Sequence, residues 1–340
     1  MTNLPPALPS RPSLLVTAAS LVVILAGMKS AKELIVPFLL AAFIAILCLP
    51  LLCALNRRKI PQTLSVFLVV GLALTAGLTL TLFIGSSLHD FSLTLPTYQS
   101  QVREETRALF RWLNQIGIEI SPQIILDYFD PSVAMKIAAN TLSSLGAVLT
   151  DGFLIVLTVI FILLEATSMP QKLQQATQQP EPSLKRFSRM TDSVQSYLAI
   201  KTAVSLLTGG LVVAILLLLK VDYPLLWGVL AFLLNFIPNI GSIIAAIPAV
   251  LLALVQHGIA CFALAAIGYI LINVIIGNVV EPRFMGQKLG LSPLVVLISL
   301  VFWGWILGPV GMLLSVPLTM VVKIVLESTE EWHWLAILLS

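Results

Sequence analysis

Long apolar runs with few or no charged residues, separated by short polar stretches, make up most of the chain. In the first two thirds of the sequence they cover residues 12–28, 34–56, 60–88, 142–167 and 198–219. Because an α-helix rises about 1.5 Å per residue, runs of this length suit the roughly 30 Å hydrocarbon core of a bilayer. The pattern therefore predicts an all-α polytopic membrane protein.

Two later runs are too long for one straight crossing. Residues 223–256 and 289–322 carry no charged residue, and as straight helices they would each be about 50 Å long. Each is interrupted near its middle, where the first reads FIPNIGSIIAAIPA and the second reads ILGPVGMLLSVPL. With the run at residues 258–280, the chain holds about eight hydrophobic segments, two of them broken.

The two interruptions contain proline and glycine at similar spacings. Proline removes a backbone donor, whereas glycine permits positive φ and close approach of the backbone, so a helix can stop there. The freed N–H and C=O groups then need partners that lipid does not supply. We expect re-entrant hairpins or kinked spanning helices; the plainer explanation is that both residues are common in transmembrane helices. The expected hinge or break residues are Pro248, Gly308, Pro309, Gly311 and Pro317.

The charged residues between the runs predict which side of the membrane each loop faces. Cytoplasmic loops carry an excess of Lys and Arg, so the basic clusters at residues 57–59 and 172–189 are expected in the cytoplasm, together with both termini. Residues 89–140 then lie outside the cytoplasm. We expect a small helical insertion there, with amphipathic helices near residues 98–116 and 122–139.

The same pattern divides the chain into five parts. They are residues 1–88 with three transmembrane helices, 89–140 as the extracytoplasmic insertion, 141–222 with two more transmembrane helices and a cytoplasmic loop at 168–196, 223–327 with the broken segments, and 328–340 as a C-terminal tail.

Composition agrees with a membrane protein and excludes several other classes. Hydrophobic residues form 58% of the sequence and charged residues 10%, against about 25% charged residues in soluble domains. The net charge of +3 is scattered among loops, which argues against a nucleic-acid interface. The chain lacks a GxxxxGK[ST] loop, an HExxH motif and paired metal-binding cysteines, so we expect no cofactor, no metal and no enzymatic activity.

Polar and aromatic side chains near the breaks are candidates for binding a small polar solute. Asparagine offers both donors and acceptors, and an aromatic ring can stack on a ligand ring. The alternative roles are contacts between helices for asparagine and interfacial packing for tryptophan. The expected substrate-binding residues are Asn235, Pro238, Asn239, Gly241, Asn273, Asn278, Trp303 and Trp305.

Ionisable residues in or beside the apolar runs form a second set of candidates, because a charge at membrane depth is costly and usually functional. Glu281 and Arg283 bracket Pro282 at a helix end, and Glu165 lies near the end of the fourth run. We expect these three residues to act in ion coupling or gating. The alternative is that they are solvated charges at helix ends.

Three stretches carry a family resemblance: NFIPNIGSIIAAIPAVLLALV, INVIIGNVVEPRFMGQKLGLSPLVV and SLVFWGWILGPVGMLLSVPLTMVVKI. They resemble the autoinducer-2 exporter family of bacterial inner-membrane permeases, and the similarity extends over nearly the whole chain. The resemblance implies about eight membrane segments, a homo-oligomer for which a pentamer is suggested, and a small polar solute, autoinducer-2, as cargo.

The resemblance leaves three functions open. The leading one is a secondary transporter that exports autoinducer-2 and thereby modulates quorum sensing and biofilm formation. Because some family members are similar to antiporters, the second is sodium or lithium exchange for protons. The third is a membrane regulator that transports nothing.

Overall fold

The computed structural model describes residues 14–115, 152–166, 168–169, 172, 175, 180–238, 240–285, 291–327 and 332–339. Within these ranges every regular element is helical, as the sequence predicts. In chain order the elements are α1 (Leu14–Ser30), α2 (Lys32–Arg57), α3 (Gln62–Gln115), α6 (Gly152–Ala166), α8 (Pro180–Leu218), α9 (Pro224–Leu234), α10 (Gly241–Ile275), the π-helical turn η1 (Ile276–Val280), α11 (Glu281–Met285), α12 (Pro293–Leu307), α13 (Pro309–Glu327) and α14 (His333–Leu338).

Several described helices have the length and apolar composition of membrane spans. The stretches long enough to cross are Lys32–Arg57, Gln62–Thr94, Ser188–Leu218, Gly241–Phe284 and Pro309–Glu327. The shorter apolar helices are Gly152–Ala166, Pro224–Leu234 and Pro293–Leu307. Many large apolar side chains on these helices are exposed, which suits contact with lipid and confirms a polytopic membrane protein.

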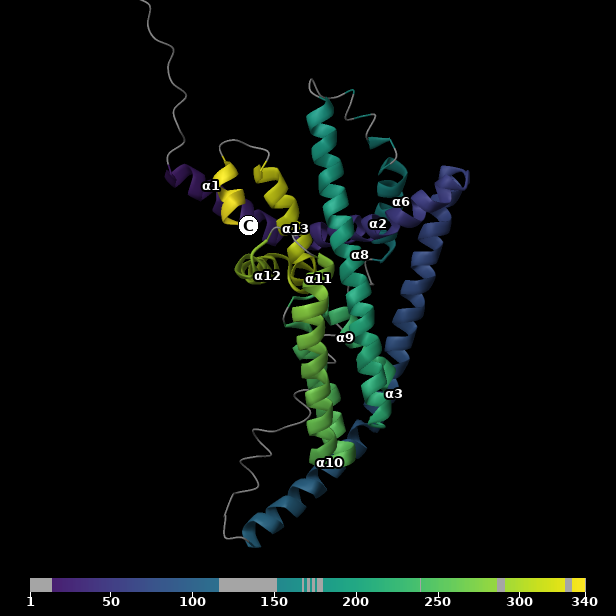
Figure 1. Cartoon of the computed structure of the whole chain (residues 1–340), viewed down its shortest axis with the longest axis vertical. Coiled ribbons are helices and arrows are strands. Elements are labelled where there is room, and N and C mark those ends of the chain that lie inside the picture. The colour runs from purple at the N-terminus through teal and green to yellow at the C-terminus, as the bar shows by residue number, and fades with distance from the viewer. Residues whose placement is uncertain are drawn as a thin grey trace, which may run out of the picture.

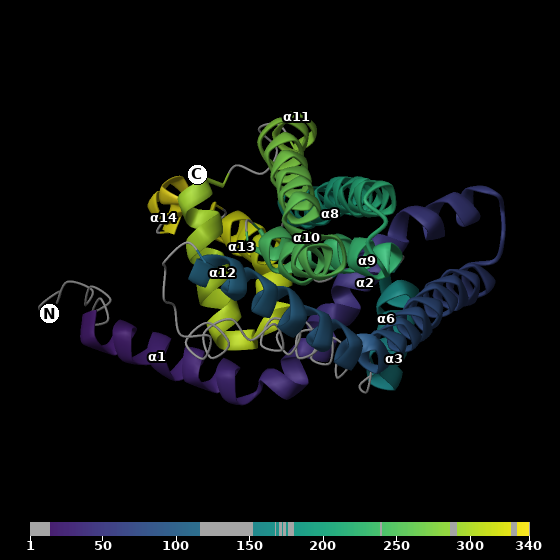
Figure 2. The same ribbon diagram turned by 90° about the horizontal axis from the view of Figure 1, so that it is seen from below.

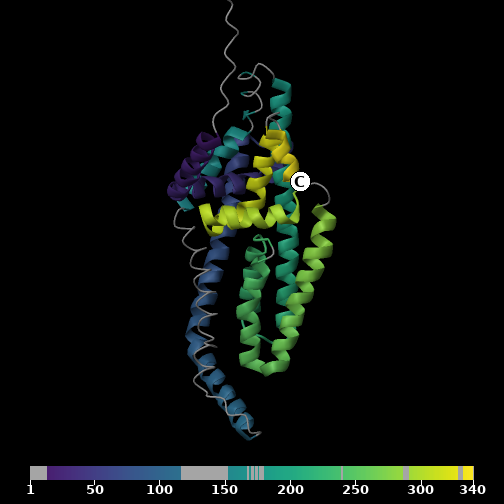
Figure 3. The same cartoon turned by 90° about the vertical axis from the view of Figure 1, so that its left-hand side faces the viewer.

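The helices run in two main directions. In Figure 1, α3, α8 and α10 follow the long axis of the molecule, whereas α2 crosses it. In Figure 3, α12 also lies across the long axis, above the green helices α9 and α10. Seen along the axis in Figure 2, α8, α9 and α10 are adjacent, and α2, α3 and α6 gather to one side of them.

Each of these two groups has its own apolar core. Ala41, Val66 and Leu163 belong to the core of α2, α3 and α6. Trp227 and Leu252 belong to the larger core of α8, α9 and α10. A third, smaller cluster of buried residues joins α8 to α13, so α8 contacts both the first and the second broken segment.

The first broken segment is a helical hairpin. α9 ends at Leu234, and α10 begins at Gly241, where an added Cβ would lie 1.7 Å from the carbonyl oxygen of Leu234. At the other end of the two limbs, the backbone N–H of Asp222 donates to Gln256 Oε1 at 3.0 Å. The limbs are therefore antiparallel, and α9, at about 16 Å, is too short to cross a bilayer by itself.

The second broken segment is a helix pair with a sharp turn at Gly308, which caps α12 with φ of 73°. A Cβ at Gly311 would lie 2.0 Å from the carbonyl oxygen of Trp303, so α13 starts in close contact with the end of α12. The boundary between α12 and α13 therefore lies at Gly308 and Pro309, two of the residues expected as hinge or break positions.

Other expectations differ from the structure. α10 and α13 continue through Pro248 and Pro317, which were expected as breaks, and the non-helical residue inside α10 is Gly258, with φ 74° and ψ −170°. Such values are open only to glycine, whereas a transmembrane helix tolerates proline when neighbouring groups satisfy the freed carbonyl.

Two polar regions are also more helical than expected. α3 extends without a break to Gln115, across the boundary expected after residue 88. α8 begins at Pro180, inside the stretch 168–196 that was expected to be a loop. The amphipathic helix expected near residues 122–139 lies outside the described residues.

The close approach at the first break makes Gly241 a test of the hairpin. We expect Gly241→Ala to destabilise the folded protein by about 1–3 kcal/mol, because the added methyl group has no room beside Leu234. Thermal unfolding in detergent measures this. Gly210→Ala is the matched control, since its Cβ would meet nothing within 4 Å; equal melting temperatures for the two variants would contradict the tight hairpin.

Candidate transport site

One face of α8 carries buried polar side chains through an otherwise apolar helix. Tyr197, Lys201, Ser205 and Thr208 follow one another at intervals of four, four and three residues, which places them on the same face. All four are buried, and Lys201 is only 3% exposed. Ionisable groups at such positions are rare and mark functional sites more often than structural ones. These four residues are called the α8 polar face below.

Lys201, which is buried, forms an ion pair with the partly buried Glu281. Its Nζ donates to Glu281 Oε1 at 2.7 Å, and the two side chains are 4% and 21% exposed. Glu281 begins α11 directly after the π turn η1, and the following Pro282 has no N–H to donate. Single π turns inside helices often lie at functional sites. The local change in helix geometry therefore brings a carboxylate to the α8 polar face.

Asn235 reaches the same face one helical turn along. It caps the C-terminus of α9, and its Nδ2 donates to Ser205 Oγ at 2.9 Å. The next residue, Phe236, makes an edge-on contact with Phe43 of α2, with ring centroids 6.5 Å apart. The tip of the hairpin is therefore held between α8 and α2.

The arrangement brings two helix discontinuities to one line of polar groups. Glu281 faces Lys201 and Asn235 faces Ser205, so charged and neutral donors and acceptors lie within one turn of α8. Beside Lys201, the hydroxyl oxygen of Thr202 is buried and has no hydrogen-bond partner among the described residues. These donors and acceptors are of the kind that hydrogen-bond to the hydroxyl groups of a small solute, and the carboxylate is of the kind that exchanges a proton.

The other residues expected at the first break have different surroundings. Asn273 is half-buried, and Asn278, in η1, is exposed. Gly241 and Pro238 belong to the turn between α9 and α10, where the Pro238 carbonyl accepts from the Ile240 N–H. Asn239 lies outside the described residues. Of the expected asparagines, Asn235 is the one that bonds to the α8 polar face in the described part of the chain.

The two tryptophans near the second break contact protein groups. Trp303 Nε1 donates to Thr319 Oγ1 of α13 at 3.0 Å. The ammonium of Lys29 lies 4.1 Å from the centroid of the Trp305 ring. The Trp305 side chain is otherwise exposed. These contacts fit packing between α12, α13 and α1, which was the alternative role considered for both residues.

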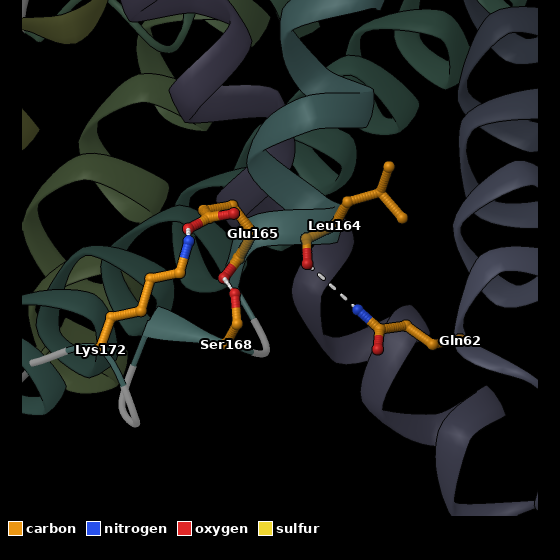
Figure 4. Close-up of polar contacts among 5 residues, drawn as sticks. All are labelled: Gln62, Leu164, Glu165, Ser168 and Lys172. Atoms are coloured by element: carbon orange, nitrogen blue, oxygen red, sulfur yellow. Dashed lines mark hydrogen bonds and ion pairs between the residues drawn. The ribbon is translucent and has the colours of Figure 1, made fainter. Parts of the chain in front are cut away.

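Glu165 lies away from the α8 polar face, beside a cavity of about 550 Å³ that is lined mainly by apolar residues of α2 and α6. It pairs with Lys172, and Figure 4 shows the two side chains meeting while Gln62 donates to the Leu164 carbonyl at 3.1 Å. The start of α3 and the end of α6 therefore lie at the same end of the molecule. Both charged side chains are about half exposed, as expected for an interfacial pair.

Arg283 is exposed, and Glu281 pairs with Lys201 instead of with this arginine. Sequence reasoning did not select Lys201 or Ser205. For Lys201 a signal was present, because it is the single charged residue inside the predicted span 198–219. For Ser205 the sequence holds no comparable signal, since serine is common in membrane helices.

Known proteins match this chain over nearly its full length. It is 45% identical over 320 residues to the AI-2 transport protein TqsA of Escherichia coli K12, and the match covers 94% of this chain and 93% of that protein. It is 42% identical over 328 residues to a putative transport protein of Haemophilus influenzae, with 95% of this chain and 94% of the relative covered. The putative transport protein YhhT of Escherichia coli K12 is 38% identical over 328 residues, with 96% and 94% covered.

The model of the AI-2E family transporters matches residues 18–331. The matched region includes all the spans, both broken segments and the α8 polar face. The chain thus belongs to the AI-2E family of transporters, and it is a membrane transporter and not an enzyme.

Proposed function

We propose that this protein exports autoinducer-2, or a closely similar small polar solute, across the bacterial inner membrane and thereby modulates quorum sensing and biofilm formation. The observation that carries the proposal is the meeting of two helix discontinuities at the buried α8 polar face. Discontinuous helices near the middle of the bilayer are the usual place for a transporter's binding site. The identity of the cargo rests on the similarity to a protein named as an AI-2 transporter.

In this proposal the hairpin, formed by α9 and by the first limb of α10 (residues 241–257, before Gly258), is re-entrant. It enters from the extracytoplasmic side, and its tip holds Asn235 against Ser205. Solute hydroxyl groups replace this hydrogen bond and pair with the hydroxyl of Thr202, which has no partner in the described part of the chain. Residues 57–59 and both termini face the cytoplasm, as the basic loops prefer.

Glu281 is the proposed coupling group. Protonation of its carboxylate removes one charge of the pair, so Lys201 is left buried and unpaired, and a buried unpaired charge is strongly unfavourable. The protein then favours an arrangement in which Lys201 finds another partner. Protonation is in this way linked to a change in the packing of α8 against α11.

The same ion pair supports a second candidate function, exchange of sodium or lithium for protons. A partly buried carboxylate beside a lysine can bind either a proton or, when the lysine moves away, a cation. This candidate function involves no polar solute, so transport would depend on Glu281 and not on Asn235.

We further propose that the protein is a homo-oligomer, for which the family resemblance suggests a pentamer. Large exposed apolar side chains such as Leu82 and Leu218 would then be shared between lipid and neighbouring copies.

Transport of labelled autoinducer-2 into proteoliposomes tests the cargo and the site together. We expect Asn235→Ala to lower the flux by about tenfold, since one hydrogen bond in a buried polar site is worth about 1 kcal/mol or more. Asn278→Ala is the matched control, because Asn278 is exposed, and its flux is expected to stay near that of the wild type. An equal loss of flux in the two variants would show that Asn235 does not belong to the binding site.

Imposed proton and sodium gradients separate the two candidate functions. The proposal expects a proton gradient to accelerate autoinducer-2 flux in the wild type. Proton movement driven by sodium, with no flux of autoinducer-2, would instead favour the antiporter. Silence in both assays would favour a membrane regulator that transports nothing.

Variants of the ion pair test the coupling role of Glu281. We expect Glu281→Gln to destabilise the protein by about 3–5 kcal/mol, because it leaves Lys201 buried without a counter-charge. The double variant Lys201→Met, Glu281→Gln is expected to recover most of this loss in thermal unfolding, while flux no longer responds to a proton gradient. A double variant that remained proton-coupled would show that the pair has only a structural role.

A further inference from the structure

At the base of the hairpin, three polar side chains from three different segments meet. Tyr98 of α3 donates its phenol to Asp222 Oδ2 at 2.7 Å, and Gln256 Nε2 donates to the Tyr98 oxygen at 3.2 Å. Gln256 Nε2 also donates to Asp222 Oδ2, and its Oε1 accepts from the Asp222 backbone N–H at 3.0 Å. These three residues, called the base latch below, close a ring of hydrogen bonds across the start of α9 and the end of the first limb of α10.

Aromatic side chains pack against the base latch. The ring of Phe91 lies 6.2 Å from Tyr98 and 5.5 Å from Trp227, measured between centroids. Trp227 is 1% exposed and donates its Nε1 to the Asp222 carbonyl at 3.1 Å. Burial, and next the carboxylate of Asp222, raise the pKa of Tyr98 to about 12, so its phenol remains a donor at neutral pH.

Two unusual backbone segments adjoin the residues of the base latch. On one side Lys220 and Tyr223 have φ of 57° and 58°, in the left-handed region that is rare for residues other than glycine. On the other side Gly258, two residues after Gln256, breaks the helical geometry of α10. Hinges are commonly a few such residues at the ends of elements, where large changes of φ and ψ are absorbed. These positions, here called the two hinges, are where the backbone at the base of the hairpin would change if the hairpin moved, and Asp222 and Gln256 of the base latch lie beside them.

We propose that Tyr98, Asp222 and Gln256 form a gate of the transporter, which is fastened in this structure and releases the base of the hairpin when it opens. Movement at the two hinges carries the hairpin tip, and with it Asn235, away from Ser205. The latch and its opening follow from the geometry at the base; the statement that opening lets the solute pass rests on the proposed function.

The chain contains a native reporter for this opening. Cys261 lies three residues after Gly258, is 7% exposed, and has its Sγ 3.9 Å from the Leu219 carbonyl, next to the first hinge. A thiol of this kind reacts with a maleimide only when the surrounding structure opens, so its labelling rate follows the population of the open form. Cys48, also 7% exposed, lies in the core of α2, α3 and α6 and reports general unfolding in the same sample.

The test compares two Tyr→Phe variants of the full-length protein in proteoliposomes, with maleimide labelling of each cysteine followed by peptide mass spectrometry. Tyr98→Phe removes the donor to Asp222, and a hydrogen bond to a charged group is worth roughly tenfold in an equilibrium. We expect Cys261 to be labelled about tenfold faster, with no change at Cys48. In Tyr269→Phe, which removes a buried hydroxyl without a partner among the described residues, both rates are expected to stay at the wild-type level.

Gln256→Ala serves as a second variant, because it removes the other side of the ring from a half-buried position, and the same acceleration at Cys261 is expected. Unchanged labelling of Cys261 in both latch variants overturns the proposal, as does an equal rise at Cys48, which would indicate general destabilisation. Autoinducer-2 flux is measured on the same proteoliposomes. Faster labelling of Cys261 without flux in any protein supports the latch and counts against the proposed cargo only.

Discussion

The backbone groups freed where a helix stops need hydrogen-bond partners, and in hydrocarbon only the protein itself or a bound molecule can supply them. This chain stops helices inside its apolar region at residues 235–240 and at Gly308, and it widens a third into a π turn before Glu281. The α8 polar face lies where the first and the third of these discontinuities meet. Burying its lysine, serine and threonine costs free energy unless these side chains find hydrogen-bond or ion-pair partners.

The ion pair between Lys201 and Glu281 is the clearest case of this mutual dependence. The buried charge of Lys201 is unfavourable without a counter-charge, so the pair fixes α11 against α8 as long as both groups are ionised. The bond from Asn235 to Ser205 fixes the hairpin tip to the same helix. Because both contacts use one face of α8, a change at one of them alters the surroundings of the other. This closeness is what a coupled binding and release step requires.

Much of the architecture could be predicted from the sequence, because the lengths of the apolar runs indicate where membrane helices lie. Helix class, the polytopic arrangement and the two interruptions follow from apolar runs and from proline and glycine close together within them. The non-helical position in α10, Gly258, falls where the apolar run at residues 223–256 ends and the run at residues 258–280 begins. The helix expected near residues 98–116 is the end of α3, and its continuity with the preceding span was missed because a change from apolar to polar sequence usually marks the end of a membrane helix.

The site was harder to predict than the fold, since a site depends on which distant segments meet. Glu281 was selected from its position at a helix end, but its partner lies 80 residues away and its neighbour Arg283 is exposed. Asn235 was selected as well, and only the packing of α9 on α8 identifies Ser205 as its partner. A charged residue inside an apolar run indicates that a partner from another segment is needed, and Lys201 is such a residue.

The most direct test of the account is the structure of the protein in lipid nanodiscs with autoinducer-2 bound, determined by electron cryomicroscopy. We predict solute density between Ser205, Asn235 and Glu281, with the direct hydrogen bond from Asn235 to Ser205 replaced by contacts to the solute. Density in the apolar cavity beside Glu165, with the α8 polar face unchanged, would contradict it.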